Sequence, residues 1–223
     1  MSYCLKARTF ARWVLAFSLI GFSVLGCTGA AERYHPEFPQ YSKTMNTLLV
    51  LAPEITISEQ MPDGSRMRQN ALSGQAQHTA LTSIAKELSR RHFAVRTADA
   101  AIMKMPEIRS VVSLFRSVNH SIQLHTFGPQ IFPSKLNAFE YSIGEVNAIL
   151  RACNADGLVL AIGYQTGSGQ PDRNWISIAV AEPGGRIIWY GAQGNHLKYN
   201  LADPQSMTAL VASAMAHFRG GDS

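Results

Sequence analysis

The 223-residue chain carries 20 Lys and Arg and 15 Asp and Glu, and its 46% hydrophobic and 16% charged residues are typical of an ordinary globular protein. Three of the basic residues precede residue 27 and all the acids follow it, so residues 27–223 hold 17 basic and 15 acidic residues, a net charge of +2. This balance has no dense basic stripe and excludes nucleic acid as the expected partner. Removing residues 1–26 leaves 197 residues, enough for one domain and too few for two large ones.

The first 26 residues have the order of a secretory signal peptide. Three cations precede an uncharged run, Trp13–Gly26, of 14 residues. As a helix this run spans about 21 Å, too short for a hydrocarbon core of about 30 Å. The sequence Val24-Leu25-Gly26-Cys27 resembles the lipobox of bacterial lipoproteins. That resemblance implies cleavage between Gly26 and Cys27, with lipid such as palmitate attached to Cys27.

The remaining cysteines and the residue after Cys27 bear on the compartment. Cys4 is lost with the signal, and Cys153 has apolar neighbours and no internal partner, which favours a buried, inert thiol. Thr28 stands where lipoproteins retained in the inner membrane carry aspartate. For a Gram-negative host we therefore expect a lipid-anchored protein of the outer membrane that faces the periplasm.

Residues 27–46 contain Gly29, Pro36 and Pro39 and little periodicity, which predicts a lipidated tether ahead of one globular domain over residues 47–223. Within that domain, the apolar run Thr47–Ala52 predicts a strand buried on both faces. Apolar spacing then predicts a helix over Ser73–Arg91, followed by a short strand at His92–Arg96.

The middle of the chain, residues 97–133, gives the weakest periodic signal. Asp99 can cap a helix that runs to about Asn119, in which Pro106 either kinks the helix or begins a second one. Glycine and prolines at residues 128, 129 and 133 predict a long irregular loop from His120 to Ser134, and loops of this length are usually functional. The candidate contact residues in this loop are His120, His125 and Phe127.

The second half of the chain predicts a helix, three strands and a final helix. Apolar spacing predicts the helix over Ala138–Cys153. Strand candidates follow at Leu158–Tyr164, Trp175–Val180 and Arg186–Tyr190, and their short glycine-containing links predict antiparallel hairpins. Asp203-Pro204 marks the start of the last helix. The expected fold class is α/β (α+β), a mixed sheet flanked by helices in the order β-α-β-α-α-β-β-β-α, antiparallel in its second half.

The run Ala155–Leu160, a polar hairpin, Trp175–Val180 and then Pro183–Trp189 resembles a pattern in envelope lipoproteins. That superfamily comprises the curli-secretion lipoprotein CsgG, the penicillin-binding-protein activator LpoB, the Pel lipoprotein PelC and the amino-terminal domain of TolB. The resemblance covers most of residues 47–219 and implies a non-enzymatic protein that binds envelope proteins or forms a homo-oligomer. The chain lacks the long amphipathic hairpins of the curli pore, and residues 97–133 exceed the family core.

Sequence motifs that carry catalysis are absent. The chain has no phosphate-binding Gly-x-x-x-x-Gly-Lys loop, no His-Glu-x-x-His zinc pair and no Gly-x-Ser-x-Gly nucleophile elbow. His120 and His125 have no third ligand at a matching spacing, so we expect no metal, no cofactor and no catalytic residue. Trp175 and Trp189 lie on neighbouring predicted strands, where they either form a stacking platform for a sugar or peptide or pack beneath a helix.

Two functions of different classes follow from these features. The first is a lipid-anchored, non-enzymatic scaffold or assembly and secretion partner in a cell-envelope complex. The alternative is a small-molecule or glycan-binding envelope module that uses Trp175, Trp189 and the loop at residues 120–134. The sequence identifies neither the partner protein nor the number of subunits.

Overall fold

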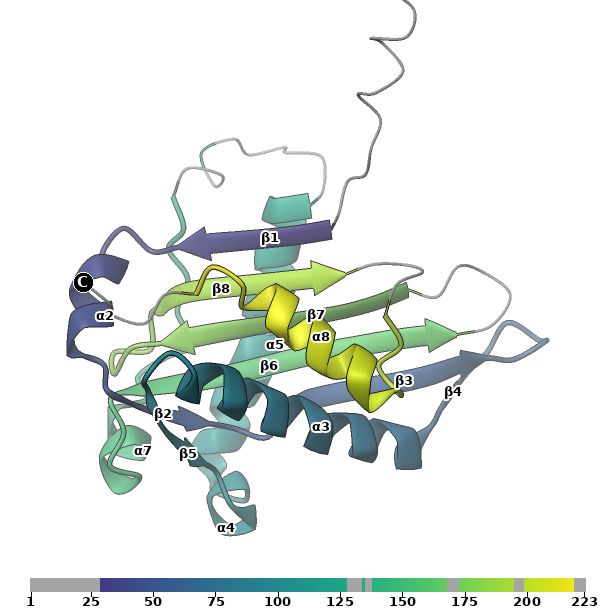
Figure 1. Ribbon diagram of the computed structural model, residues 1–223, viewed down its shortest axis with the longest axis horizontal. Helices are drawn as coiled ribbons and strands as arrows, with labels where there is room; N and C mark the ends of the chain where they lie inside the picture. Colours follow the sequence, from purple (N-terminus) through teal and green to yellow (C-terminus); the bar gives the residue numbers. More distant parts are fainter. Residues whose placement is uncertain (1–28, 128–133, 135–137, 168–172, 195–198, 219–223) are drawn as a thin grey trace, which may run out of the picture.

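An eight-stranded mixed sheet with helices on both faces forms the body of the protein (Figure 1). The computed structural model describes residues 29–127, 134, 138–167, 173–194 and 199–218. The strands are β1 (Gly29–Tyr34), β2 (Thr47–Val50), β3 (Glu54–Gln60), β4 (Arg66–Arg68), β5 (Ala94–Thr97), β6 (Gly157–Gly167), β7 (Arg173–Ala181) and β8 (Ile187–Gly194). The helices are α2 (Phe38–Thr44), α3 (Asn70–Ser89), α4 (Ala100–Met103), α5 (Pro106–Phe127), α7 (Asn147–Ala152) and α8 (Pro204–Ala214).

The long strand β6 organises the sheet, whose main order is β1-β8-β7-β6-β2-β5. The first part of β6 pairs in parallel with β2 and its last part pairs in parallel with β3, which also pairs with β4. The strands β6, β7 and β8 are consecutive antiparallel neighbours, as their short links predict. The fold is thus the expected α/β arrangement, with its antiparallel section in the second half of the chain.

Side-chain alternation along the strands builds a separate core on each face. Val159 and Ala161 face a core beneath α3 and α8, whereas Leu158 and Leu160 face a second core beneath α5 and α7. In Figure 1, α3 and α8 lie in front of the sheet and α5 lies behind it. The prediction that the apolar run at 47–52 is buried on both faces is confirmed, because consecutive residues of β2 enter different cores.

The helices α3 and α8 close the front face together. Ala76, Ala80, Ile84 and Leu88 recur every four residues of α3 and are buried against the sheet. At the end of α3, Arg91 binds Glu87 at 2.7 Å and donates hydrogen bonds to the carbonyls of Met215 and Phe218. Asp203 caps α8 by accepting a hydrogen bond from Ser206 N at 2.7 Å, as its sequence position predicts.

The tether predicted over residues 27–46 is wrong for the part that the structure describes. Gly29–Tyr34 forms β1, which pairs antiparallel with β8 along its whole length, and α2 follows it. The side chain of Glu32 on β1 accepts a hydrogen bond from Trp189 Nε1 at 2.6 Å. The strand β1 is held by backbone hydrogen bonds to β8, a strand far away in the sequence. Such pairing leaves no hydrophobic pattern in the local sequence, so β1 could not be predicted. The strands β3 and β4 were equally absent from the sequence prediction.

Two helix boundaries also differ from the prediction. Pro106 begins a second helix after the Asp99-capped α4, and this second helix, α5, continues to Phe127, so the first eight residues of the predicted loop at 120–134 are helical. The loop residues 128–133 lie outside the described residues.

The predicted helix Ala138–Cys153 is helical only over α7. Ile143 N donates instead to Gly185 O at 2.8 Å, and Gly144 adopts φ +77°, a left-handed conformation that interrupts a helix. Ile143 and Val146, which suggested a longer helix, are still buried, because the segment ahead of α7 packs them against the sheet.

Candidate interaction surface on helix α5

Helix α5 crosses the rear face of the sheet and presents its opposite side to solvent (Figure 1). Ile108, Val111, Phe115, Asn119 and Ile122 are its buried residues. Large apolar side chains nevertheless remain exposed on it: Leu114 by 49%, Leu124 by 56% and Phe127 by 41%. Exposed apolar side chains that gather on one element mark candidate binding surfaces.

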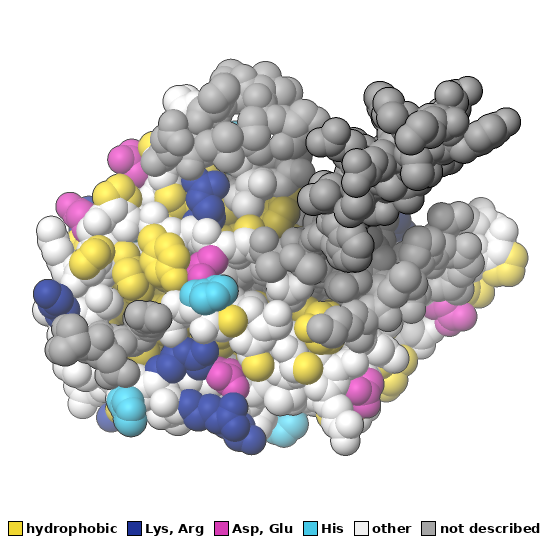
Figure 2. Space-filling model, turned by 45° about the horizontal axis from the view of Figure 1, so that its top comes forward, with side chains coloured by type: hydrophobic (Ala, Val, Ile, Leu, Met, Phe, Trp, Pro, Cys, Tyr) yellow, Lys and Arg dark blue, Asp and Glu magenta, His cyan; other side chains and the backbone are white. Residues whose placement is uncertain are grey.

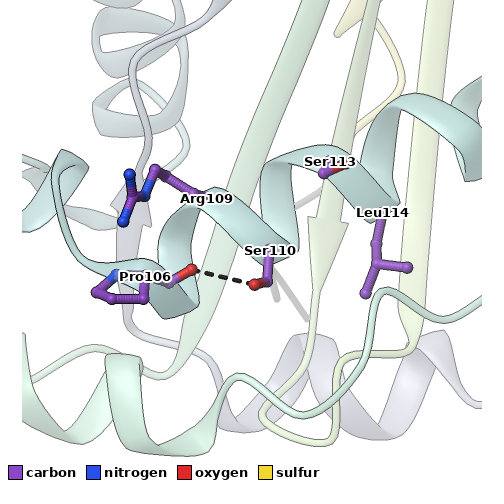
Figure 3. A pocket seen from close by; sticks show the side chains of 5 residues that line it. All are labelled: Pro106, Arg109, Ser110, Ser113 and Leu114. Atoms are coloured by element: carbon purple, nitrogen blue, oxygen red, sulfur yellow. Dashed lines mark hydrogen bonds between the residues drawn. The ribbon is translucent and has the colours of Figure 1, made fainter.

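A groove of about 550 Å³ lies along the amino-terminal half of α5 and is shown in Figure 3. Ser110 and Leu114 project from the same side of the helix, and a Cβ on Gly144 would meet Leu114 Cδ1 at 3.7 Å. Ser110 Oγ donates to Pro106 O at 3.1 Å, so this hydroxyl is already satisfied. We call the pocket and the five residues that line it the α5 groove: Pro106, Arg109, Ser110, Ser113 and Leu114.

At the other end of α5 an aromatic patch is formed by Leu124, Phe127, Tyr164 and Trp175. Phe127 meets Trp175 edge-on, with ring centroids 4.4 Å apart and an interplanar angle of 88°. Trp175 is the cross-strand partner of Tyr164, which is 41% exposed. Directly paired residues in a sheet project from the same face, so Tyr164 and Trp175 are both on the α5 side. Two predicted contact residues, Phe127 and Trp175, are therefore in direct contact.

A buried polar network lies beneath this patch and centres on Ser177. Ser177 Oγ accepts hydrogen bonds from Trp175 Nε1 at 2.7 Å and from Gln123 Nε2 at 3.1 Å. Tyr190 Oη lies 2.9 Å from Asn119 Oδ1 and 2.9 Å from Ser177 Oγ. Because Tyr190 gives its single hydrogen to Asn119, Ser177 supplies the hydrogen for the last bond. The network thereby joins α5 to β7 and β8.

Burial is the main cause that raises the pKa of Tyr190, although Ser177 and Gln123 act in the opposite direction. The phenol therefore stays neutral at physiological pH and serves as a hydrogen-bond donor. The sequence did not reveal this network. Its polar residues lie at positions of the strands and of α5 that face the core, where a hydrophobic pattern predicts only apolar side chains.

The two histidines predicted as contacts lie on α5 and not in a loop. His120 is exposed, whereas His125 Nδ1 lies 2.9 Å from Tyr141 Oη. Successive residues of an α-helix are rotated by about 100°, so side chains five positions apart point about 140° away from each other. His120 and His125 therefore face different sides of α5. In the described part of the chain, no group of three His, Cys, Asp or Glu side chains could hold a metal ion.

Of the two interpretations of Trp175 and Trp189, the shared stacking platform is wrong, because the two residues lie on opposite faces of the sheet. Trp189 is 0% exposed in the core beneath α8, and its ring lies 4.6 Å from that of Phe218. The other interpretation, a strand tryptophan packed beneath a helix, describes Trp189. Trp175 remains partly exposed at the end of α5.

Cys153 is only half-buried, and burial is the first cause that raises the pKa of its thiol. The expected full burial of Cys153 is therefore wrong, whereas a raised pKa favours the protonated, weakly nucleophilic thiol and its inertness stays a prediction. Gly26 and Cys27, the predicted cleavage and lipidation site, lie outside the described residues.

A second cleft, of about 400 Å³, lies beside α2 and was not anticipated from the sequence. Its Arg186 binds Glu37 at 2.7 Å and Glu182 at 3.3 Å, and it also bonds Tyr41. With all these partners, the guanidinium acts as a structural link between α2 and the β7–β8 turn. Figure 2 shows basic and acidic side chains interspersed on the face it presents, with no stripe of one sign among the coloured residues.

Across the described residues, none of the helices combines the length and the hydrophobicity required to cross a bilayer. No protein-family model and no curated protein sequence matches the chain.

Comparison with solved structures finds similar folds in bacterial proteins. The PelC dodecamer from Paraburkholderia phytofirmans is 12% identical with a TM-score of 0.45, covering 86% of this chain and 98% of that chain. Lipoprotein GNA1162 from Neisseria meningitidis is 13% identical with a TM-score of 0.36, covering 79% of this chain and 99% of that chain. The LpoB C-terminal domain from Salmonella enterica is 13% identical with a TM-score of 0.28, covering 71% and 93%. PelC and LpoB are also named in the resemblance noted from the sequence, and membership of that superfamily stays a prediction.

Proposed function

We propose that this chain is a lipid-anchored protein of the bacterial cell envelope that acts as a non-enzymatic scaffold or assembly partner. The observation that carries the proposal is the outward side of α5, which combines an open groove with exposed apolar side chains. The signal-like segment ending in Val24–Cys27 supports the anchor. Each buried CH₂ of an acyl chain contributes about 0.8 kcal/mol, so two or more chains on Cys27 would hold the protein stably.

The α5 groove fits a segment of another envelope protein that presents an apolar side chain next to a carboxylate. Leu114 offers about half of its side chain to solvent at one edge of the groove. Arg109 lines the same groove, and none of the described acidic side chains forms an ion pair with it. Arginine is enriched at protein interfaces, and Arg109 extends from a different side of the helix than Leu114, so a partner would have to span both side chains (Figure 3).

The anchor is tested by expressing the full chain with Cys27→Ser and labelling cells with palmitate. We expect the wild type to be processed and labelled and the variant to stay uncleaved and unlabelled. Processing of the variant at the same site, with label retained, would disprove lipidation at Cys27. Density separation of the two membranes then tests the outer-membrane location that Thr28 suggests.

The partner surface is tested by placing a photo-crosslinking amino acid at Ser113, an exposed residue of the α5 groove, in the lipidated protein in native membranes. The matched control is Gln75, an exposed residue of α3 on the opposite face. We expect a reproducible heterologous adduct from position 113 only, and its loss when Leu114→Asp is added. Equal adducts from both positions would contradict the groove as a binding surface, and an adduct with a second copy would indicate a homo-oligomer.

The ligand-binding alternative keeps one specific observation, the partly exposed ring of Trp175 between Phe127 and Tyr164. A ligand that binds only the folded state raises thermal stability. A shift with cell-wall glycan fragments that disappears in Trp175→Ala would favour this alternative over the scaffold.

A further inference from the structure

The strand β1 begins two residues after Cys27, the predicted lipid attachment site. Two residues of fully extended chain span at most about 7 Å. If Cys27 carries lipid, Gly29 therefore lies within about 7 Å of the membrane surface. The folded body then rests at the bilayer, because the described chain has no tether that would let it stand away.

The pairing register shows which part of the body accompanies Gly29. Gly29 pairs with Gly194, Gly194 pairs with Trp175, and Trp175 pairs with Tyr164, so the four residues form one row across the sheet. Neighbouring strands lie about 4.8 Å apart, which places Trp175 about 10 Å and Tyr164 about 14 Å from Gly29 along this row. Figure 1 shows the start of β1 at the same end of the sheet as the start of β7 and the end of β6.

The aromatic patch therefore occupies the end of the sheet from which the lipid anchor emerges. Phe127 reaches this row by its contact with Trp175, and Leu124 lies one helical turn earlier on α5. The patch exposes two aromatic rings by 41% each and Leu124 by 56%. Amphipathic aromatic residues such as Trp and Tyr are enriched at membrane–water interfaces, where one end of the side chain is apolar and the other polar.

We propose that the aromatic patch of Leu124, Phe127, Tyr164 and Trp175 inserts into the headgroup and upper acyl region of the bilayer that holds the lipid on Cys27. The proposal rests on the lipid anchor in the proposed function. Apolar faces at membrane interfaces are typically buried by about 5–10 Å, and the short reach from Cys27 to Gly29 keeps this end of the sheet close enough to the bilayer for such insertion.

This orientation separates the two sites of α5. Leu114 precedes Leu124 by ten residues, which is about 15 Å of helix. With the aromatic patch in the membrane, the α5 groove lies in the amino-terminal half of the helix, one or more turns away from the residues that contact lipid. One helix then serves two purposes, contact with lipid at its carboxyl-terminal end and contact with a partner in its amino-terminal half.

The test compares spin labels at Leu124→Cys and at Leu114→Cys, two similarly exposed leucines of the same helix, each in a Cys153→Ala background. The lipidated protein is reconstituted in phosphatidylethanolamine–phosphatidylglycerol vesicles. We expect the label at position 124 to gain accessibility to oxygen and lose accessibility to a water-soluble nickel reagent when the vesicles are added. The label at position 114 should stay accessible to the nickel reagent.

The outcomes separate this proposal from the anchor on which it rests. If the protein floats with the vesicles but both labels stay accessible to the nickel reagent, the aromatic patch does not enter the membrane and the proposal is overturned. If mass spectrometry finds no lipid on the amino-terminal peptide, the anchor fails and the proposal fails with it. Trp175→Ser combined with Phe127→Ser should return the label at position 124 to water without detaching the lipidated protein.

Discussion

The face of the sheet beneath α3 and α8 is closed by an apolar core and a charged clamp, whereas the face beneath α5 combines its apolar core with a buried polar network and with apolar side chains exposed on the helix. On the first face Trp189 is fully buried and Arg91 ties the two helices together. On the second, the Ser177 network is buried while Leu124 and Phe127 are exposed. This difference suggests that the first face chiefly supplies stability and that the second is shaped for contact with other molecules.

The largest expected effect is the difference between the two strand tryptophans. Trp189→Ala should lower the free energy of unfolding by about 3–5 kcal/mol, because it leaves a cavity in a packed core. Trp175→Ala should cost clearly less, because Trp175 is partly exposed and its removal leaves less of a buried cavity, even though one hydrogen bond to Ser177 is lost. Urea unfolding of both variants measures the difference, and equal costs would remove the proposed contrast between the faces.

Arg91→Ala should give the next largest loss, about 1.5–3 kcal/mol, because it removes hydrogen bonds from a charged group to Glu87 and to two carbonyls. Burial raises the pKa of Glu87, but the bonds and charges of Arg91 and Arg90 outweigh it and lower the pKa overall. Because the pKa of Glu87 is lower in the folded protein than the value of about 4.3 in the unfolded chain, its charged form stabilises the fold at pH values above about 4.3. This stabilisation is lost as the pH falls through the folded pKa.

The pH dependence gives the control for this clamp. Glu87→Gln should be less stable than the wild type at pH 7, and the two proteins should converge in stability as the pH falls toward 3. Urea unfolding at several pH values measures this convergence. A constant difference across the range would show that the charge of Glu87 is not what stabilises the clamp.

Tyr190→Phe should cost about 1–3 kcal/mol, because it leaves Asn119 and Ser177 without their buried partner. The raised pKa of Tyr190 adds a pH dependence: the stability of the wild type should fall as the pH rises above about 10, where the unfolded phenol ionises and the folded one does not. Alkaline unfolding of the variant should lack this contribution. An identical alkaline decline in both proteins would exclude Tyr190 as its source.

Local hydrophobic patterns were enough to predict the strands β2, β6, β7 and β8 and the helix α3. The apolar runs of β2 and β6 and the four-residue spacing in α3 are strong because both kinds of element face large cores. The strand β1 has no such pattern, since an edge strand is held by backbone bonds to β8 rather than by its own side chains. The last turns of α5 were predicted to be a loop, because Gly128 and Pro129 are residue types typical of loops and the predicted loop was extended back to His120.

The candidate lipid site at Cys27 comes from sequence alone, because a signal and its cleavage motif are short, contiguous features. Only the tertiary structure decided that Trp175 joins Phe127 and Tyr164, and that Trp189 belongs to the other face. The deciding quantity is strand register: Trp175 pairs with Gly194, five positions from Trp189, and an odd offset places two side chains on opposite faces. Register depends on how distant strands meet, so no local pattern in the sequence determines it.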